Sequence, residues 1–209
     1  MDNNGHEPTS NGDLAAWSAI LGGALLLINW VWHGYLGLSL DRNEILLDSA
    51  HYAYYINEFL LFISAFCLLF AIMDLKHVSN LKGLFGELGL YISILGMTLF
   101  ALGNLGLIVH GFADSHTLYN VIGLCTGVGN LAMHIGAFPL GIALLKGTGF
   151  LKISAYFFLL QTIVVMIYLS GIIQLNTFIA GILMGGLYGV GWIYVGLFLL
   201  RRGYGGSVE

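Results

Sequence analysis

The segment HYAYYINEFLLFISAFCLLFAIMD, residues 51–74, decides the class of fold. It contains no Lys or Arg, and Glu58 is the single carboxylate in its interior. About 20 predominantly apolar residues in a helix are enough to cross the hydrocarbon core of a bilayer. The segment therefore predicts a transmembrane helix that carries one acidic side chain.

The same pattern recurs along the chain, and we expect six such spans. They are Ala15–Ser39, His51–Asp74, Leu84–His110, Leu118–Leu145, Ile153–Gln174 and Thr177–Leu200. No Lys or Arg lies inside any of them, and the apolar runs are continuous rather than alternating, which excludes a β-barrel. The sequence predicts an all-α fold, a polytopic membrane bundle of six transmembrane helices with short connections.

Composition excludes the soluble classes of protein. Of 209 residues, 58% are hydrophobic and 9% are charged, whereas soluble domains carry about 25% charged residues. The formal net charge of −4 provides no basic surface for nucleic acid. We therefore expect a multi-pass protein of the cell membrane. Its partners would be the lipid bilayer and other membrane subunits, with no nucleic acid.

The basic residues predict the orientation of the bundle. Six of the seven fall on one side of the expected spans: Lys76, Lys82, Lys146, Lys152, Arg201 and Arg202. Only Arg42 falls on the other side. By the positive-inside rule both termini are expected in the cytoplasm. We divide the chain into a mobile polar tail at 1–13, a six-helix domain at 14–202 and a short cytoplasmic tail at 203–209.

Regularly spaced glycines predict where helices pack closely. Small residues let backbones approach each other in a membrane, where lipid is as apolar as the side chains. Three spans carry such series: Gly89, Gly96 and Gly103; Gly123 and Gly127; and Gly181, Gly185 and Gly189. We expect all three series to face neighbouring helices.

Several polar residues collect toward the outer leaflet. Glu58 lies roughly 10 Å inside the second span at 1.5 Å per residue, and His33, His51, His110 and His116 lie in or near the same leaflet. We expect Glu58 to point into the bundle toward His33 and His110, where it is protonated, binds a cation or accepts hydrogen bonds.

Three interpretations of this outer group remain open. His51 and His116 are typical of interfacial side chains that bond to lipid headgroups. The second interpretation is a transition-metal site of His33, His51, Glu58 and His110. The third is a b-type haem with His33 and His110 as axial ligands, since such ligands often come from two helices.

A second pattern links the two halves of the chain. Asn29-x-x-x-His33 in the first span is matched by Asn130-x-x-x-His134 in the fourth. These spans begin two three-helix halves that would run in opposite directions, as an inverted repeat requires. On this hypothesis Asn29, Glu58, Asn130 and His134 line a path for a substrate or ion.

The second half of the chain also resembles known families. The last span reads GVGWIYVGLFLLR at residues 189–201, and the fourth ends GAFPLGIALLK at residues 136–146. These stretches resemble small six-span bacterial and archaeal membrane families of unknown function. The resemblance implies six helices and supplies no catalytic or ligand residues.

The sequence thus favours an accessory protein, a small non-catalytic subunit of a membrane complex that holds a metal or haem in the outer leaflet. The first alternative is a small transporter with a 3+3 inverted repeat that uses Glu58 and the two Asn/His pairs. The second is a membrane-embedded metalloenzyme that acts on lipid.

Overall fold

The computed structural model describes residues 10–39, 52–77, 81–113, 116–172 and 177–204. Within these ranges six helices are long and apolar enough to cross a membrane, which confirms the all-α, six-span prediction. The elements are α1 (Ser10–Ser39), α3 (Tyr52–Leu75), α4 (Leu84–Ala113), α5 (His116–Leu144), α6 (Phe150–Ser170), α7 (Thr177–Gly181), η2 (Ile182–Gly186) and α8 (Leu187–Tyr204).

Two helix ends differ from the expectation. Helix α1 begins at Ser10, inside the segment expected to be a polar tail. Helix α6 ends at Ser170, earlier than expected, because Gly171 adopts a left-handed conformation (φ 67°) and its N–H bonds to the carbonyl of Tyr168 at 3.3 Å. Glycine takes this conformation without strain, so it commonly terminates helices.

The last span is continuous but contains an irregular turn. Helix α7 passes into the π-helical turn η2 and then into α8. π-Helical turns are rare and occur mostly as single insertions within longer α-helices. Here the turn ends at Gly186, two residues before Tyr188, which is fully buried.

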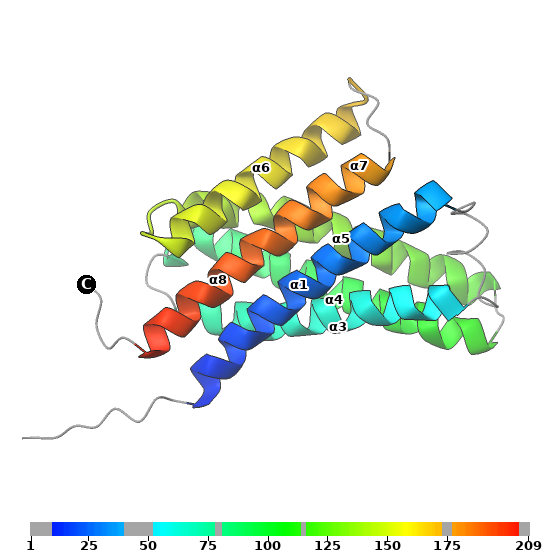
Figure 1. Cartoon of the computed structure of the whole chain (residues 1–209), viewed down its shortest axis with the longest axis horizontal. Helices are drawn as coiled ribbons and strands as arrows, with labels where there is room; N and C mark the ends of the chain where they lie inside the picture. Colours follow the sequence, from blue (N-terminus) through cyan, green and yellow to red (C-terminus); the bar gives the residue numbers. More distant parts are fainter. Residues whose placement is uncertain (1–9, 40–51, 78–80, 114–115, 173–176, 205–209) are drawn as a thin grey trace, which may run out of the picture.

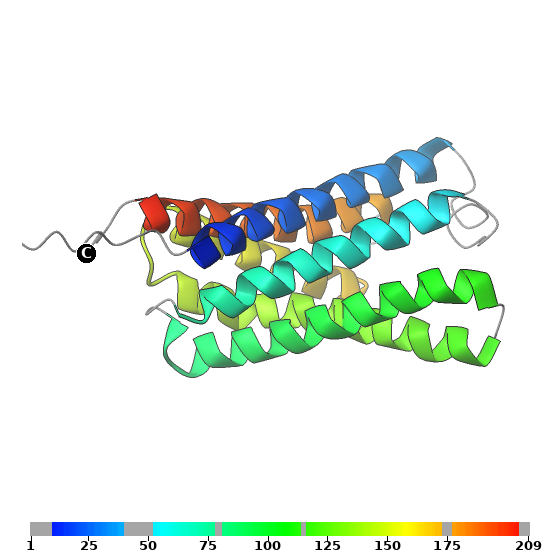
Figure 2. The same ribbon diagram turned by 90° about the horizontal axis from the view of Figure 1, so that it is seen from below.

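The helices are arranged in a closed sequence of neighbours. Helix α1 packs on α3 and α8, α4 packs on α3 and α5, and α6 packs on α5 and α8. The start of α1 and the end of α8 lie at the same end of the bundle (Figures 1 and 2). Lys76, Lys82, Lys146, Lys152, Arg201 and Arg202 are all exposed at helix ends on this side, which we call the basic end. Arg42 lies outside the described residues.

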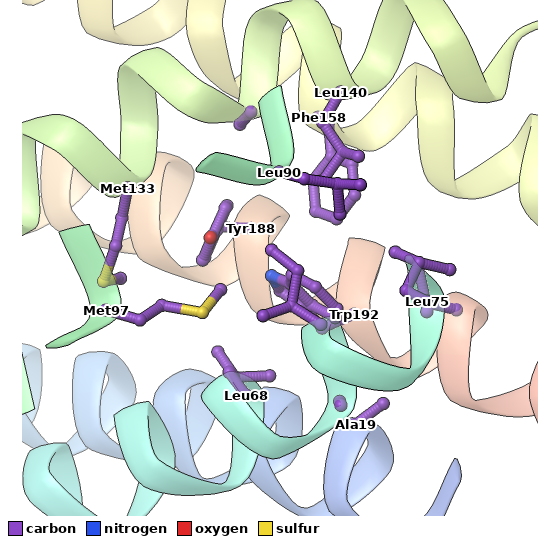
Figure 3. Close-up of a cluster of buried hydrophobic side chains, with 14 of the residues drawn as sticks. Ala19, Leu68, Leu75, Leu90, Met97, Met133, Leu140, Phe158, Tyr188 and Trp192 are labelled. Carbon is purple, nitrogen blue, oxygen red and sulfur yellow. The ribbon is translucent and has the colours of Figure 1, made fainter. Parts of the chain in front are cut away.

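Side chains fill the middle of the bundle. Tyr188 and Trp192 of α8 are fully buried and lie among Phe158, Leu68 and Met97 from other helices (Figure 3). The outward surface, in contrast, carries large apolar side chains that are half exposed or more. Examples are Leu21, Phe66, Leu95, Leu124, Ile163 and Met166. A soluble protein rarely exposes so many large apolar side chains, so this surface fits a protein surrounded by lipid.

Glycines bring α1 and α8 into close contact, as predicted. A Cβ atom at Gly189 would lie 2.5 Å from the carbonyl oxygen of Gly23, and Gly23 meets Gly189 in the same way. At Gly181 and Gly185 an added Cβ would collide with the indole ring of Trp30. The expectation that this series faces a neighbouring helix is therefore confirmed.

The series in α4 also packs as predicted, against α5. Added Cβ atoms at Gly89, Gly96 and Gly103 would meet the backbone of Leu140, Met133 and Thr126 respectively. These contacts make α4 and α5 a second tightly apposed pair.

The expectation for Gly123 and Gly127 is wrong. Both are exposed, and no atom of another described helix lies within 4 Å of a Cβ built at either position. Helix α5 instead turns Gly129 and Gly136 toward α4, where added Cβ atoms would meet Phe100 and Ser93. Two glycines four residues apart lie on the same face of a helix. Their spacing does not determine whether that face packs on a neighbouring helix or lies on the surface of the bundle.

We expect Gly189→Ala to destabilise the protein by about 1–3 kcal/mol, because the new methyl group meets a backbone carbonyl that cannot rotate away. Gly127→Ala is the matched control. It should be neutral or stabilising, since Ala favours a helix over Gly by about 1 kcal/mol. Thermal unfolding in detergent measures both variants. Equal melting temperatures for the two variants would contradict the close contact between α1 and α8.

The positions of the basic residues predict which end of the bundle is cytoplasmic. A reporter that is active only in the cytoplasm should be active when fused after Glu209. The same reporter inserted between Ala113 and His116 should be inactive. The opposite pair of results would reverse the orientation.

Candidate functional site

Glu58 lies inside the bundle, with only 7% of its surface exposed. It is six residues from the start of α3, so about 9 Å from that end of the helix. Its neighbour Asn57 is also buried, whereas Ile56 and Phe59 on either side of the pair face outward. Successive residues of a helix point in different directions, and α3 turns this one acidic position away from lipid.

A chain of hydrogen bonds leads from α1 to the Glu58 carboxyl. The Asn29 side-chain amide of α1 donates to Asn57 Oδ1 at 2.9 Å, and the Asn57 amide donates to Glu58 Oε1 at 2.8 Å. Asn29 is 1% and Asn57 is 3% exposed. Both amides therefore donate in the same direction, toward the carboxyl group.

The second oxygen of the carboxyl differs from the first. Glu58 Oε2 is buried and has no hydrogen-bond partner among the described residues. The expected spans contain no Lys or Arg to serve as a counter-ion. An unpaired carboxylate inside a membrane is costly, and either a proton on Oε2 or a small cation against it would remove the charge. The hydrogen bond from Asn57 occupies Oε1, so Oε2 is the oxygen that can hold the proton or contact the cation.

The histidines predicted to surround Glu58 cannot be placed. His51 and the side chains of His33 and His110 lie outside the described residues, so the metal site and the haem site stay predictions. Their helices do flank α3. Asn29 lies one turn before His33 on α1, and the Tyr54 hydroxyl of α3 donates to the Leu107 carbonyl of α4 at 3.0 Å, three residues before His110. Within the described part of the chain, no group of three His, Cys, Asp or Glu could hold a metal.

A second buried polar contact joins α5 to α6. His134 Nδ1 lies 2.8 Å from Gln161 Nε2, and both side chains are buried. The His134 ring also meets the edge of the Tyr188 ring of α8, with 5.5 Å between centroids. Gln161 Oε1 has no partner among the described residues. Asn130, one turn before His134, is half-buried.

The two polar contacts lie at different depths. Glu58 is near the end of the bundle opposite the basic end, whereas His134 is ten residues before the end of α5, about 15 Å from the basic end at the helical rise. Polar residues therefore occur at two levels of the membrane, on two different helix pairs.

Sequence reasoning identified Asn29, Glu58 and His134 but missed Asn57 and Gln161. Both missed residues are amides isolated in apolar spans, and polar groups in that setting usually have a partner or a function. That signal was available in the sequence. The identity of the partner was not, because it depends on the rotation of neighbouring helices.

Comparisons with protein-family models, with curated proteins and with solved structures found no match.

We expect the amides of Asn29 and Asn57 to be energetically coupled. In a double-mutant cycle, Asn29→Ala and Asn57→Ala should couple by about 0.6 kcal/mol, the average for hydrogen bonds between membrane helices. Denaturation by SDS in mixed micelles gives the free energies of unfolding.

Ser64 provides the control for this cycle. Its hydroxyl bonds to the Gly22 carbonyl at 2.7 Å across the same pair of helices, two turns from Asn29. Asn29→Ala and Ser64→Ala should therefore be additive within about 0.5 kcal/mol. Additivity of the Asn29 and Asn57 variants would mean that their hydrogen bond is absent in the membrane.

Proposed function

We propose that this integral membrane protein is a small proton-translocating transporter in which Glu58 binds and releases the proton. The observation that carries the proposal is the buried carboxyl with one oxygen held by Asn57 and the other without a partner among the described residues. Ionisable groups inside membranes commonly belong to proton relays and ion paths.

A purely structural role for Glu58 is the main competing interpretation. A hydrogen bond from Asn57 needs only an acceptor, and a Gln carbonyl at position 58 would accept it equally well. A glutamic acid adds one property that glutamine lacks, which is the capacity to gain and lose a proton. The comparison of Glu with Gln at this position therefore separates the two roles.

His134 supplies a second titratable group for a proton path. Its ring contacts Gln161 through Nδ1 and packs against the Tyr188 ring in a T-shaped arrangement. Histidine is a frequent member of proton relays, because both ring nitrogens can carry a proton. We infer that protons pass between the level of Glu58 and the level of His134.

The order of helix contacts supports an inverted repeat. Around the bundle, glycines whose added Cβ would lie less than 3.0 Å from the backbone of a neighbouring helix join α1 to α8 and α4 to α5. Buried polar side chains join α1 to α3 and α5 to α6. In an inverted repeat α1 corresponds to α5, α3 to α6, and α4 to α7–α8. The α1–α8 glycine contact then corresponds to the α5–α4 contact, and the α1–α3 polar contact corresponds to the α5–α6 contact. Inverted repeats with sites near the repeat interface are typical of secondary transporters.

The accessory-subunit hypothesis, with a metal held by His33, His51, Glu58 and His110 or a b-type haem held by His33 and His110, remains a second prediction. Metal and haem analysis of the purified protein tests it directly. Stoichiometric haem would favour electron transfer, and bound zinc or iron would favour a metalloenzyme.

Proton flux into liposomes tests the transporter proposal. Purified protein is reconstituted with a trapped pH-sensitive dye, and a potassium diffusion potential drives protons inward. We expect flux with the wild type and a fall to the level of protein-free liposomes with Glu58→Gln. Glu87→Gln, which removes an exposed carboxyl near the basic end of α4, should leave the flux unchanged.

Folding is checked by the melting temperature of each variant before reconstitution. Wild-type flux no greater than that of protein-free liposomes would argue against proton transport. Flux that survives Glu58→Gln would leave Glu58 with the structural role alone.

A further inference from the structure

A small pocket lies at the basic end, between the start of α4 and the end of α5. Its volume is about 60 Å³, and its walls include Lys82, Lys146, Leu84, Phe85 and Ile142. One water needs about 10–15 Å³, so the pocket has room for a small group of several non-hydrogen atoms. A phosphate group, with one phosphorus and four oxygens, is of this size.

The charge around the pocket is positive. Lys82 precedes α4 and Lys146 follows α5, so two separate segments contribute a lysine to the lining of one cavity. Neither lysine forms an ion pair with a described residue, and no carboxylate is among the residues that line the pocket. Glu87 is exposed one turn further along α4 and lies outside this lining.

The surroundings of the pocket are apolar. Leu84 is 77% and Phe85 is 49% exposed, although both lie beside the two lysines. Such side chains are unfavourable in water but suit the boundary between headgroups and acyl chains. Lysines at this boundary extend their charged ends toward the headgroups.

We propose that this pocket binds the phosphate of an anionic phospholipid, with Lys82 and Lys146 on either side of it. Leu84 and Phe85 contact the adjoining glycerol and acyl region. A soluble phosphate would satisfy the lysines but would leave those two apolar side chains uncovered, so the lipid is the better fit. The site is independent of the proposed proton transport, because it lies at the opposite end of the bundle from Glu58.

Lipid titration of the delipidated protein tests the proposal. Phosphatidylglycerol, phosphatidylcholine or inorganic phosphate is added in mixed micelles, and native mass spectrometry counts the bound molecules. We expect saturable binding of phosphatidylglycerol that is about 30-fold weaker in the double variant Lys82→Gln/Lys146→Gln, since each lysine near an anionic surface contributes about 1 kcal/mol.

Two further double variants separate a defined site from general attraction. Lys152→Gln/Arg202→Gln removes the same charge from exposed positions at the basic end and should bind phosphatidylglycerol as the wild type does. Lys82→Arg/Lys146→Arg keeps the charge and should retain most of the binding. Should Lys82→Gln/Lys146→Gln fail to fold, the two single Gln variants replace it, each with about 5-fold weaker binding.

Three results would overturn the lipid site. Equal weakening in both charge-removing variants would mean diffuse attraction to the basic end. Binding of inorganic phosphate at the same concentrations would mean a soluble anion site. Equal binding of phosphatidylcholine and phosphatidylglycerol would mean that the lysines do not recognise the headgroup charge.

Discussion

A polar group inside the hydrocarbon core of a membrane has no water to bond to, so it must find a partner within the protein. This constraint accounts for the helices first, since a helix satisfies its own backbone. It then governs the side chains. Asn29, Asn57 and Glu58 satisfy one another across α1 and α3, while His134 and Gln161 do so across α5 and α6. Several buried polar atoms, Gln161 Oε1 among them, have no partner among the described residues, and Glu58 Oε2 differs from them because it belongs to a carboxyl group, which can gain and lose a proton.

The remaining helix contacts depend on shape rather than on polarity. Lipid is as apolar as leucine, so close packing of small residues holds neighbouring helices together. Gly23 and Gly189 bring the backbones of α1 and α8 together, and Gly96 does the same for α4 against α5. A methyl group at these positions would meet backbone atoms, so the two pairs can keep this close approach only with glycine there. The buried polar contacts described above lie between other helices, where α1 meets α3 and where α5 meets α6.

Much of this architecture could be predicted from the sequence. The lengths of the apolar runs gave six spans, because a bilayer fixes how many residues a crossing helix needs. The series Gly181, Gly185 and Gly189 was placed correctly, but the pair Gly123 and Gly127 was not, since spacing identifies a face without identifying its neighbour. The inward position of Glu58 was expected, yet its bond to Asn57 was not. Side-chain partners depend on helix rotation, which local sequence does not determine.

Helix α1 contacts its two neighbours in different ways, and this difference affects how the bundle can open. Helix α1 meets α8 through backbone contact at Gly23 and Gly189, whereas two hydrogen bonds join it to α3: Asn29 donates to Asn57, and Ser64 of α3 donates to the Gly22 carbonyl. Hydrogen bonds between membrane helices are individually weak, about 0.6 kcal/mol on average, whereas two closely apposed backbones gain many dispersion contacts that are lost when the helices separate. We therefore expect a change that opens the bundle to separate α1 from α3 before it separates α1 from α8. In the proposed function, Glu58 exchanges its proton with water, and a separation of α1 from α3 is the movement that would bring water to it.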